Sequence, residues 1–159
     1  MNKIIVIGCP GSGKSVFSRK LHEITGIPLY PLDMIHWRAD KTFIPRERLI
    51  EEIKKIAVTD KWIFDGNYRS TMELRMSYCD TIIFLDYPTE VCYEGIMKRR
   101  GTARPDIPWV ESPDEIDEEF VNTVLNYNMV DRTVVIERIE KYSDREIHIF
   151  NTRAVTALR

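Results

Sequence analysis

The segment Gly8-Cys9-Pro10-Gly11-Ser12-Gly13-Lys14-Ser15 decides the fold of this chain. It matches the pattern G-x-x-x-x-G-K-[ST] at every fixed position, and chance gives this match in well under ~1 % of chains of ordinary composition and similar length. A short apolar run at residues 4–7 precedes the segment, and an amphipathic stretch begins at Lys14. This context of strand, loop and helix predicts a P-loop, in which backbone N–H groups and a helix N-terminus bind phosphate.

Each residue type in this P-loop has a chemical role in binding a nucleoside triphosphate. Gly8, Gly11 and Gly13 let the backbone turn so that successive N–H groups converge on phosphate oxygens. Lys14 is expected to reach the β- and γ-phosphates, and the Ser15 hydroxyl is a ligand for Mg²⁺. We therefore expect ATP and Mg²⁺ as cofactors, and the residues that bind them to be Gly8, Cys9, Pro10, Gly11, Ser12, Gly13, Lys14, Ser15 and Val16.

Cys9 occupies a variable position of the P-loop. A helix N-terminus lowers the pKa of a thiol, so a redox-regulated thiol is one interpretation, and a small filler residue is the favoured one. Cys79 and Cys92 lie far from Cys9 in the sequence, and no cysteine pair has the spacing of a zinc site. Three reduced thiols are typical of a cytoplasmic protein.

Composition and charge exclude several classes of protein. The length of 159 residues predicts a single domain, residues 1–159. Lys and Arg number 23 and Asp and Glu number 25, so the formal net charge is −2. This balance disfavours nucleic acid as a partner, because general nucleic-acid binding needs a basic surface. No run approaches the ~20 apolar residues of a membrane span, and no signal peptide is recognisable, so we expect a soluble cytoplasmic protein without a membrane partner.

Short apolar runs alternate with amphipathic stretches along the chain. This pattern predicts an α/β fold, whose parallel sheet is buried on both faces. The expected strands are residues 4–7, 62–64, 82–85 and 147–150, with a weaker candidate at 29–32 because Pro31 cannot donate to a ladder. Helices are expected at residues 14–25, 89–100 and 130–142. Another begins after Pro45 and has Leu49, Ile53, Ile56 and Ala57 on one face. A fifth begins at the capping box Ser112-Pro113-Asp114-Glu115 and ends at about Tyr127.

Further segments resemble a known family of P-loop proteins. Trp62-Ile63-Phe64-Asp65-Gly66-Asn67-Tyr68-Arg69 resembles the adenylate-kinase-like branch of P-loop kinases, in which the third strand ends in Asp-Gly and an Arg follows. Together with Leu32-Asp33-Met34-Ile35-His36-Trp37 and Phe84-Leu85-Asp86-Tyr87-Pro88, it resembles the bacterial DNA topology modulation protein family. The resemblance covers most of the chain. It implies a three-layer P-loop fold with a five-stranded parallel sheet in the order 2-3-1-4-5, a small lid after the fourth strand and, despite the family's name, a small-molecule kinase.

Two carboxylates follow predicted strands and are candidates for the chemistry. Asp65 ends a strand that we expect beside the first one, where a Mg²⁺ ligand belongs. Asp86 ends another strand and is an alternative metal ligand, although a cap at the start of the next helix is its favoured role. Asp33 ends the second strand, where a carboxylate can orient a hydroxyl acceptor and take its proton. The alternative for Asp33 is a cap on the turn that follows it.

The acceptor site is expected beyond these strand ends. The resemblance implies that Arg69, next to Tyr68, binds an anionic group of the acceptor, and the alternative for Arg69 is a surface ion pair. His36 and Trp37 are candidates for the wall of the acceptor pocket, with core packing as the alternative for both aromatic rings. The expected substrate-binding residues are Asp33, His36, Trp37, Tyr68 and Arg69.

Basic residues gather where the resemblance places the lid, at about residues 100–113. Lys98-Arg99-Arg100 is followed by Arg104, and arginines that close over a transferring phosphoryl group stabilise its negative charge. We expect Arg100 and Arg104 to be catalytic together with Lys14 and Asp33; a solvated helix end is the alternative for the basic cluster. Related kinases place an adenine-stacking Arg where this chain has Gly95, so the base must be held by Arg99 or by backbone near residues 151–153.

The leading hypothesis is an ATP- and Mg²⁺-dependent kinase that acts on a small hydroxyl-bearing metabolite, a nucleoside or a nucleotide. A nucleoside monophosphate kinase is the nearest alternative, and its acceptor phosphate would not need Asp33 as a base. A nucleotide-dependent regulator of DNA topology is an alternative from another class, but it needs a basic face. A nucleotide hydrolase is a third, and the chain has no GTPase base-recognition motif Asn-Lys-x-Asp.

Overall fold

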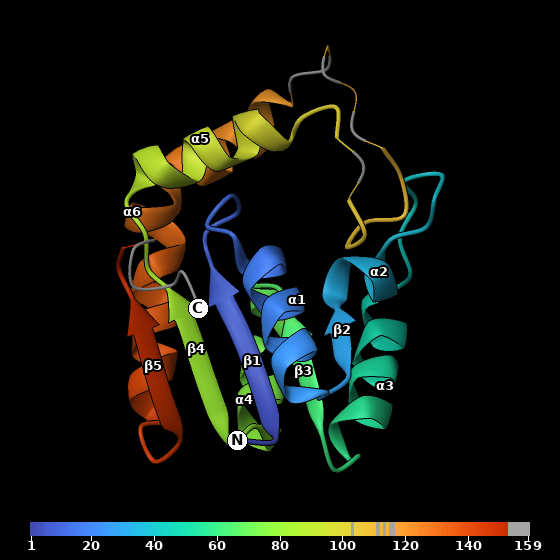
Figure 1. Cartoon of the computed structure of the whole chain (residues 1–159), viewed down its shortest axis with the longest axis vertical. Coiled ribbons are helices and arrows are strands. Elements are labelled where there is room, and N and C mark those ends of the chain that lie inside the picture. The colour runs from blue at the N-terminus through green and yellow to red at the C-terminus, as the bar shows by residue number, and fades with distance from the viewer. Residues whose placement is uncertain (103, 111, 113, 115–116, 153–159) are drawn as a thin grey trace.

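A five-stranded parallel sheet with the strand order β2-β3-β1-β4-β5 forms the centre of the protein, as predicted (Figure 1). The computed structural model describes residues 1–102, 104–110, 112, 114 and 117–152. All five predicted strands are present, and β2 is a short edge strand that ends at Pro31, as proline favours. The strands are β1 Lys3–Gly8, β2 Leu29–Pro31, β3 Trp62–Asp65, β4 Thr81–Leu85 and β5 Glu146–Phe150.

The predicted helices 14–25 and 89–100 match the structure within one residue at each end, the helix predicted after Pro45 is present, and the others differ. The helices are α1 Lys14–Thr25, α2 Leu32–His36, α3 Arg46–Ala57, α4 Arg69–Tyr78, α5 Thr89–Arg99 and α6 Glu118–Lys141. We did not predict α4, and we had expected only a turn where α2 lies. The two helices that we predicted at the C-terminal end are wrong. A single helix, α6, replaces them because no glycine or proline interrupts the chain there.

The start of α6 also differs from the prediction. Asp117 caps the helix, and its side chain accepts a hydrogen bond from the backbone N–H of Phe120 at 3.1 Å. The predicted capping box lies upstream of this cap, and its residues Pro113 and Glu115 lie outside the described residues. Within the described residues, no helix is long and apolar enough to cross a membrane.

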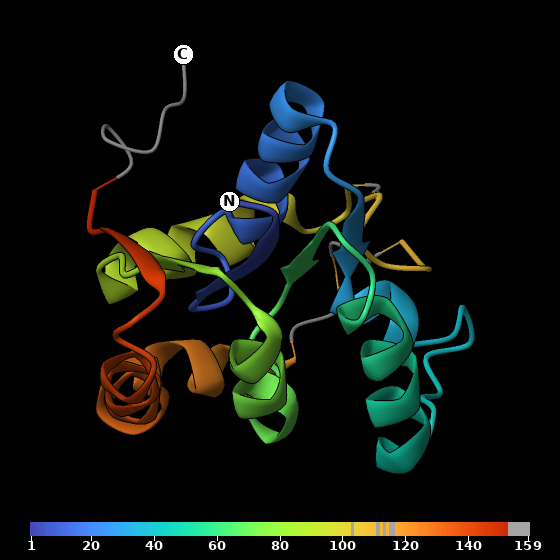
Figure 2. The ribbon, with the colours of Figure 1, turned by 90° about the horizontal axis from the view of Figure 1, so that it is seen from below.

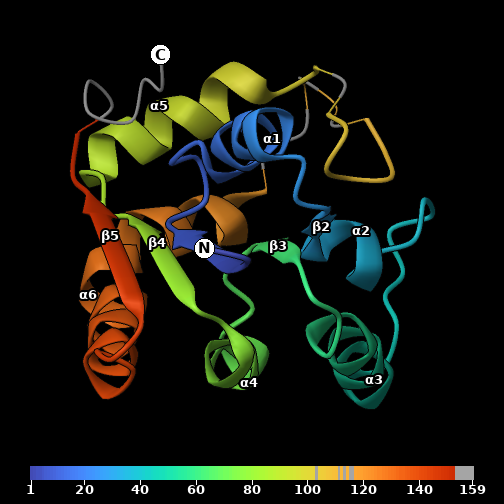
Figure 3. The ribbon, with the colours of Figure 1, turned by 60° about the horizontal axis from the view of Figure 1, so that its bottom comes forward.

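Helices cover both faces of the sheet (Figures 2 and 3). Helices α1 and α5 lie on one face, and α3, α4 and α6 lie on the other. Alternate residues of β1 point to opposite faces, so Ile4 and Val6 pack in one apolar cluster while Ile5 and Ile7 pack in the other. The continuous apolar runs therefore predicted a sheet that is buried on both sides, and the structure confirms it.

Helix α5 crosses directly over the P-loop, and two glycines allow this close approach. A Cβ on Gly11 would lie 2.0 Å from the backbone oxygen of Cys92, and a Cβ on Gly95 would lie 2.1 Å from the backbone oxygen of Gly11. Gly11 also has φ +84°, a conformation that favours glycine. Gly95 is therefore needed for packing, which explains physically why no stacking arginine stands at this position.

Replacing Gly95 with alanine is expected to destabilise the protein by about 1–3 kcal/mol, because the new methyl group overpacks against the P-loop backbone. The sign of this change in the free energy of unfolding is informative, because a glycine-to-alanine substitution in an unobstructed helix stabilises a protein by up to about 1 kcal/mol. Urea unfolding measures the difference, with the exposed neighbour Glu94→Ala as the control. An alanine variant at least as stable as the wild type would show that α5 moves away from the loop at no cost.

Candidate functional site

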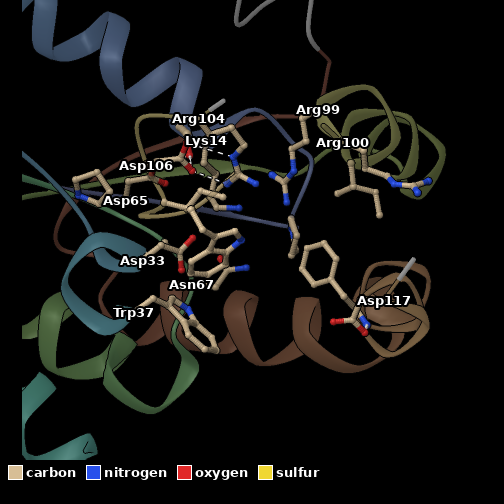
Figure 4. Close-up of a pocket in the computed structure, with 18 of the residues that line it drawn as sticks. Lys14, Asp33, Trp37, Asp65, Asn67, Arg99, Arg100, Arg104, Asp106 and Asp117 are labelled. Atoms are coloured by element: carbon tan, nitrogen blue, oxygen red, sulfur yellow. Dashed lines mark hydrogen bonds and ion pairs between the residues drawn. The ribbon is translucent and has the colours of Figure 1, made fainter. Parts of the chain in front are cut away.

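A cavity of about 610 Å³ opens at the carboxyl ends of β1, β2 and β3. Its walls come from the P-loop, the start of α2, the turn after β3, the end of α5, the segment 104–110 and the start of α6 (Figure 4). The structure thus brings together most of the residues predicted from the sequence. Those that line the cavity are Pro10, Lys14, Ser15, Asp33, Trp37, Asp65, Tyr68, Arg100 and Arg104.

The P-loop has the geometry expected of a phosphate site. Gly13, with φ +94°, immediately precedes α1, so the N-terminus of that helix points at the loop. The ammonium group of Lys14 donates to the backbone oxygens of Gly8 at 2.8 Å and of Cys9 at 3.1 Å. Burial lowers the pKa of Lys14, and the nearby charge of Asp65 opposes this shift. Val16 is 64 % exposed and does not line the cavity.

Cys9 is a buried residue of the loop and contacts the protein interior. A hydrogen bond with Cys92 and burial both raise the pKa of its thiol. A thiol with a raised pKa stays protonated and reacts poorly with oxidants, so the geometry favours the filler interpretation over the redox interpretation.

Ser15, Asp65 and Asp106 meet beside the P-loop. The Ser15 hydroxyl lies 3.0 Å from Asp65 Oδ2 and 3.0 Å from Asp106 Oδ2, and its single proton can be donated to only one of them at a time. Within the described residues, no group of three or more His, Cys, Asp or Glu side chains could hold a metal ion alone. One hydroxyl and one carboxylate nevertheless fit Mg²⁺, which takes few protein ligands and completes its shell with water and phosphate oxygens.

Burial raises the pKa of Asp65 from 3.8 to about 6, against the lowering effect of Lys14. In metal-free and nucleotide-free protein, protonated Asp65 contributes its whole share of the folding free energy below pH 3.8, the pKa in the unfolded chain. This contribution is lost as the pH rises through about 6, the pKa in the folded protein. We expect the wild type to lose about 3 kcal/mol relative to Asp65→Asn between about pH 4 and pH 7.

Urea unfolding of both proteins across this pH range measures that difference. The readout is the slope of the stability difference with pH, because a constant offset reports only the lost hydrogen bond to Ser15. Parallel stability curves for the two proteins would contradict the raised pKa.

Two residues without a predicted role support the turn after β3. Asn67 ties this turn to the P-loop, because its side chain accepts from the Gly8 N–H at 2.9 Å and donates to the Gly8 carbonyl at 2.5 Å. Arg75 is fully buried in α4 and donates to the carbonyls of Gly66, Asn67 and Tyr68. Burial lowers the pKa of Arg75 to about 9. An arginine beside Met72 and Met76 on the apolar face of a helix was the sequence signal for this role.

Asp33 and aromatic side chains line the part of the cavity where the sequence predicted the acceptor site. Asp33 accepts a hydrogen bond from the Tyr68 hydroxyl, and burial together with the nearby charge of Asp33 raises the pKa of that phenol. The ring of Trp37 meets the ring of Trp109 edge to face, with centroids 5.6 Å apart. His36 does not line the cavity; its ring stacks on Phe43 at 5.2 Å, and burial lowers its pKa.

Two predicted or alternative site residues lie elsewhere. Arg69 pairs with Asp131 of α6, with Nη1 and Oδ1 2.7 Å apart, and does not line the cavity. The geometry therefore favours the surface ion pair that we kept as the alternative for Arg69. Asp86 forms a two-pronged pair with Arg132, at 2.7 Å for both hydrogen bonds, and is likewise absent from the cavity wall.

The arginines near the predicted lid have different surroundings. Arg104 pairs with Asp106 at 2.6 Å, and Figure 4 shows it beside Lys14, whereas Arg100 extends away from Lys14. Arg100 has a contact with the sulfur of Met97 at 3.6 Å. The guanidinium of Arg99 lies over the ring of Phe120, 5.8 Å from its centroid. The backbone near residues 151–153 was the other candidate for holding the nucleotide base, and residue 153 lies outside the described residues.

The fold has counterparts among solved structures. No protein-family model matches the chain, and no curated protein matches it. The shikimate kinase from Bacteroides thetaiotaomicron is similar with a TM-score of 0.55 and 19% sequence identity, over 93% of this chain and 85% of that chain. The shikimate kinase from Aquifex aeolicus has a TM-score of 0.46 and 20% identity, over 82% of this chain and 98% of that chain. The first likeness shows that this chain has the P-loop fold of a shikimate kinase.

Proposed function

We propose that this chain is an ATP- and Mg²⁺-dependent kinase that phosphorylates a hydroxyl group of a small molecule. One observation carries the proposal: a single cavity joins the P-loop, with Lys14 and Ser15, to a carboxylate, Asp33, that lies among aromatic side chains. The P-loop supplies a site for the triphosphate, and Asp33 supplies a base for an acceptor hydroxyl. The fold shared with a shikimate kinase agrees with this function.

The residues of the cavity divide the reaction between them. Lys14 and the P-loop N–H groups bind the phosphates, and Ser15 and Asp65 hold the metal ion. Mg²⁺ held by these two residues would supply positive charge that offsets the charge of the phosphates. Asp33 takes the proton of the acceptor hydroxyl while the hydroxyl oxygen forms a bond to the γ-phosphorus. The bond between the γ-phosphorus and the β,γ-bridging oxygen breaks, and ADP leaves with that oxygen. Arg104, with Arg100 as a second candidate, stabilises the charge on the transferring group.

The segment 100–113 acts as the lid of this enzyme. Its described part reaches both sides of the cavity, with Arg104 near the P-loop and Trp109 against Trp37 on the acceptor side. Such closure excludes water from the phosphoryl group. The whole chain then serves as one domain, and the motif resemblance supports placing it in the DNA topology modulation protein family, with kinase chemistry.

A hydroxyl acceptor is favoured over a nucleoside monophosphate by the positions of two residues. Asp33 lines the cavity, where a hydroxyl needs a base, whereas Arg69, the expected partner of an anionic acceptor group, points to Asp131 on α6. An already ionised phosphate has no proton for Asp33 to accept.

The test is ADP release from MgATP in the presence of a panel of acceptors, with Lys14→Ala as the blank. The panel spans sugars, hydroxy acids, nucleosides and nucleoside monophosphates. Acceleration by one class of hydroxyl compound is the expected result. If no acceptor exceeds water, the hydrolase alternative replaces the kinase, and salt-dependent binding of duplex DNA would support the regulator instead.

A further inference from the structure

We propose that Asp106 is a positioning residue that holds Arg104 at the phosphate side of the cavity and docks the lid on α1. Arg104 binds Asp106 through two hydrogen bonds, Nη2 to Oδ2 at 2.6 Å and Nε to Oδ1 at 3.3 Å. The role of Arg104 rests on the proposed kinase function, whereas the docking of the lid can be measured without turnover.

The Asp106 side chain belongs to the buried interior and not to the surface. It is 6 % exposed, and Arg104 is 12 % exposed, in a segment without a helix or a strand. A carboxylate so deeply buried needs specific partners, because its desolvation is costly. An exposed pair of this kind would contribute little to structure, but a buried two-pronged pair fixes the plane of the guanidinium.

Two residues of α1 hold Asp106 against the P-loop. The Ser15 hydroxyl lies 3.0 Å from Oδ2, and Arg19 Nη1, one turn further along the helix, lies 3.7 Å from Oδ1. Asp106 thus joins the lid arginine to the first turns of the helix that follows the P-loop. A guanidinium held there in advance needs no reorganisation when charge develops on the phosphoryl group.

The same segment is anchored at the acceptor side by apolar contacts. Ile107 is buried, and Trp109 meets Trp37 edge to face with centroids 5.6 Å apart. Asp106 and Trp109 are three residues apart, so loss of the polar anchor is expected to loosen the aromatic contact as well. The accessibility of Trp109 therefore reports on the docking by Asp106.

The arrangement favours positioning over metal binding by Asp106. Both carboxylate oxygens already accept hydrogen bonds from Arg104, and Arg19 adds a second positive charge. A cation at Asp106 would have to approach two arginines, whereas Asp65 also contacts the Ser15 hydroxyl and forms no ion pair with an arginine among the described residues. This difference makes metal affinity a decisive measurement.

The first experiment compares Asp106→Asn with Asp114→Asn, an exposed carboxylate nearby that does not line the cavity. We expect kcat of Asp106→Asn to fall about a hundredfold while KM for ATP changes less than about threefold, because a misplaced catalytic group slows the chemical step. The double variant Asp106→Asn/Arg104→Lys is expected to be within about threefold of the slower single variant, because both substitutions break one unit.

The second experiment needs no turnover. Acrylamide quenching of tryptophan fluorescence in the nucleotide-free protein is expected to increase about twofold in Asp106→Asn, because Trp109 becomes accessible. Trp62 is fully buried and contributes little to quenching. If Asp106→Asn does not fold, Asp106→Glu keeps the charge and is expected to retain docking. Increased quenching in a protein that phosphorylates no acceptor would refute the kinase but keep the docking role.

Three results would overturn the proposal. The first is unchanged quenching in Asp106→Asn, and the second is losses of kcat that multiply in the double variant. The third is an affinity for Mn²⁺ with ATP, measured by electron paramagnetic resonance, that falls tenfold or more in Asp106→Asn, as loss of a metal-site residue does. That result would make Asp106 a metal ligand.

Discussion

Replacing Lys14 with alanine is expected to lower kcat for ADP formation by about 10³-fold, the loss typical of removing one group that stabilises charge in the transition state. The ammonium group of Lys14 lies 2.8 Å from the Gly8 carbonyl, within the loop that is to receive the phosphates. Among the described residues, its hydrogen-bond acceptors are backbone carbonyls of that loop, so phosphate oxygens can replace these acceptors when the nucleotide binds.

Steady-state kinetics and nucleotide-dependent thermal stability together measure this effect. We expect MgATP to raise the Tm of the wild type and to raise that of Lys14→Ala far less, because stabilisation by a ligand follows its affinity. Lys20→Ala, an exposed lysine of the same helix, is the matched control and should behave as the wild type. Activity of Lys14→Ala within tenfold of the wild type would remove the P-loop from the mechanism.

The second large effect is expected for Asp33→Asn, with a fall in kcat of about 10²–10⁴-fold toward a hydroxyl acceptor. The amide cannot accept the proton of the hydroxyl, although it keeps the size of the side chain. Tyr68→Phe removes the hydroxyl that donates to Asp33 and is expected to have a smaller effect, because the carboxylate remains. Asp40→Asn, in an exposed loop, is the control.

This variant also separates the two kinase hypotheses. If AMP is the only effective acceptor and Asp33→Asn keeps its activity, the protein is a nucleoside monophosphate kinase. Asp33 then has only the structural role of binding Tyr68. Loss of activity with a hydroxyl acceptor, without loss of MgATP binding, supports the role of Asp33 as the base.

The strands and the P-loop were predictable because local pattern determines them. The runs at β1, β3 and β4 are apolar on both faces, which few structures other than a buried parallel strand accommodate. The strand order could not be derived from these runs; it followed from the family resemblance. Helix α4 escaped prediction because Arg75, a charged residue, interrupts its apolar face.

The partner of a charged side chain depends on tertiary structure, so the sequence predicted some of these partners and not others. Asp65 ends β3, and Ser15 follows β1 through the P-loop. These neighbouring parallel strands end at the same edge of the sheet, so the two side chains meet. Asp106 escaped prediction because two of its three partners, Ser15 and Arg19, lie far away in the sequence. No periodicity connects a loop carboxylate to a helix about ninety residues earlier. Arg69 was expected in the acceptor site but pairs with Asp131, because this ion pair depends on where α6 packs.

The contact between Gly11 and Gly95 limits where the proposed lid can bend. The backbones of the P-loop and α5 lie so close there that neither glycine has room for a Cβ, so a shift of α5 along the loop would disrupt this close packing. The pivot for opening must therefore lie beyond the end of α5 at Arg99. Gly101 has φ +74°, a conformation that glycine adopts without strain, and it lies at the start of the segment that must swing. In the proposed kinase, opening for product release would then leave the P-loop unchanged while only the lid rotates.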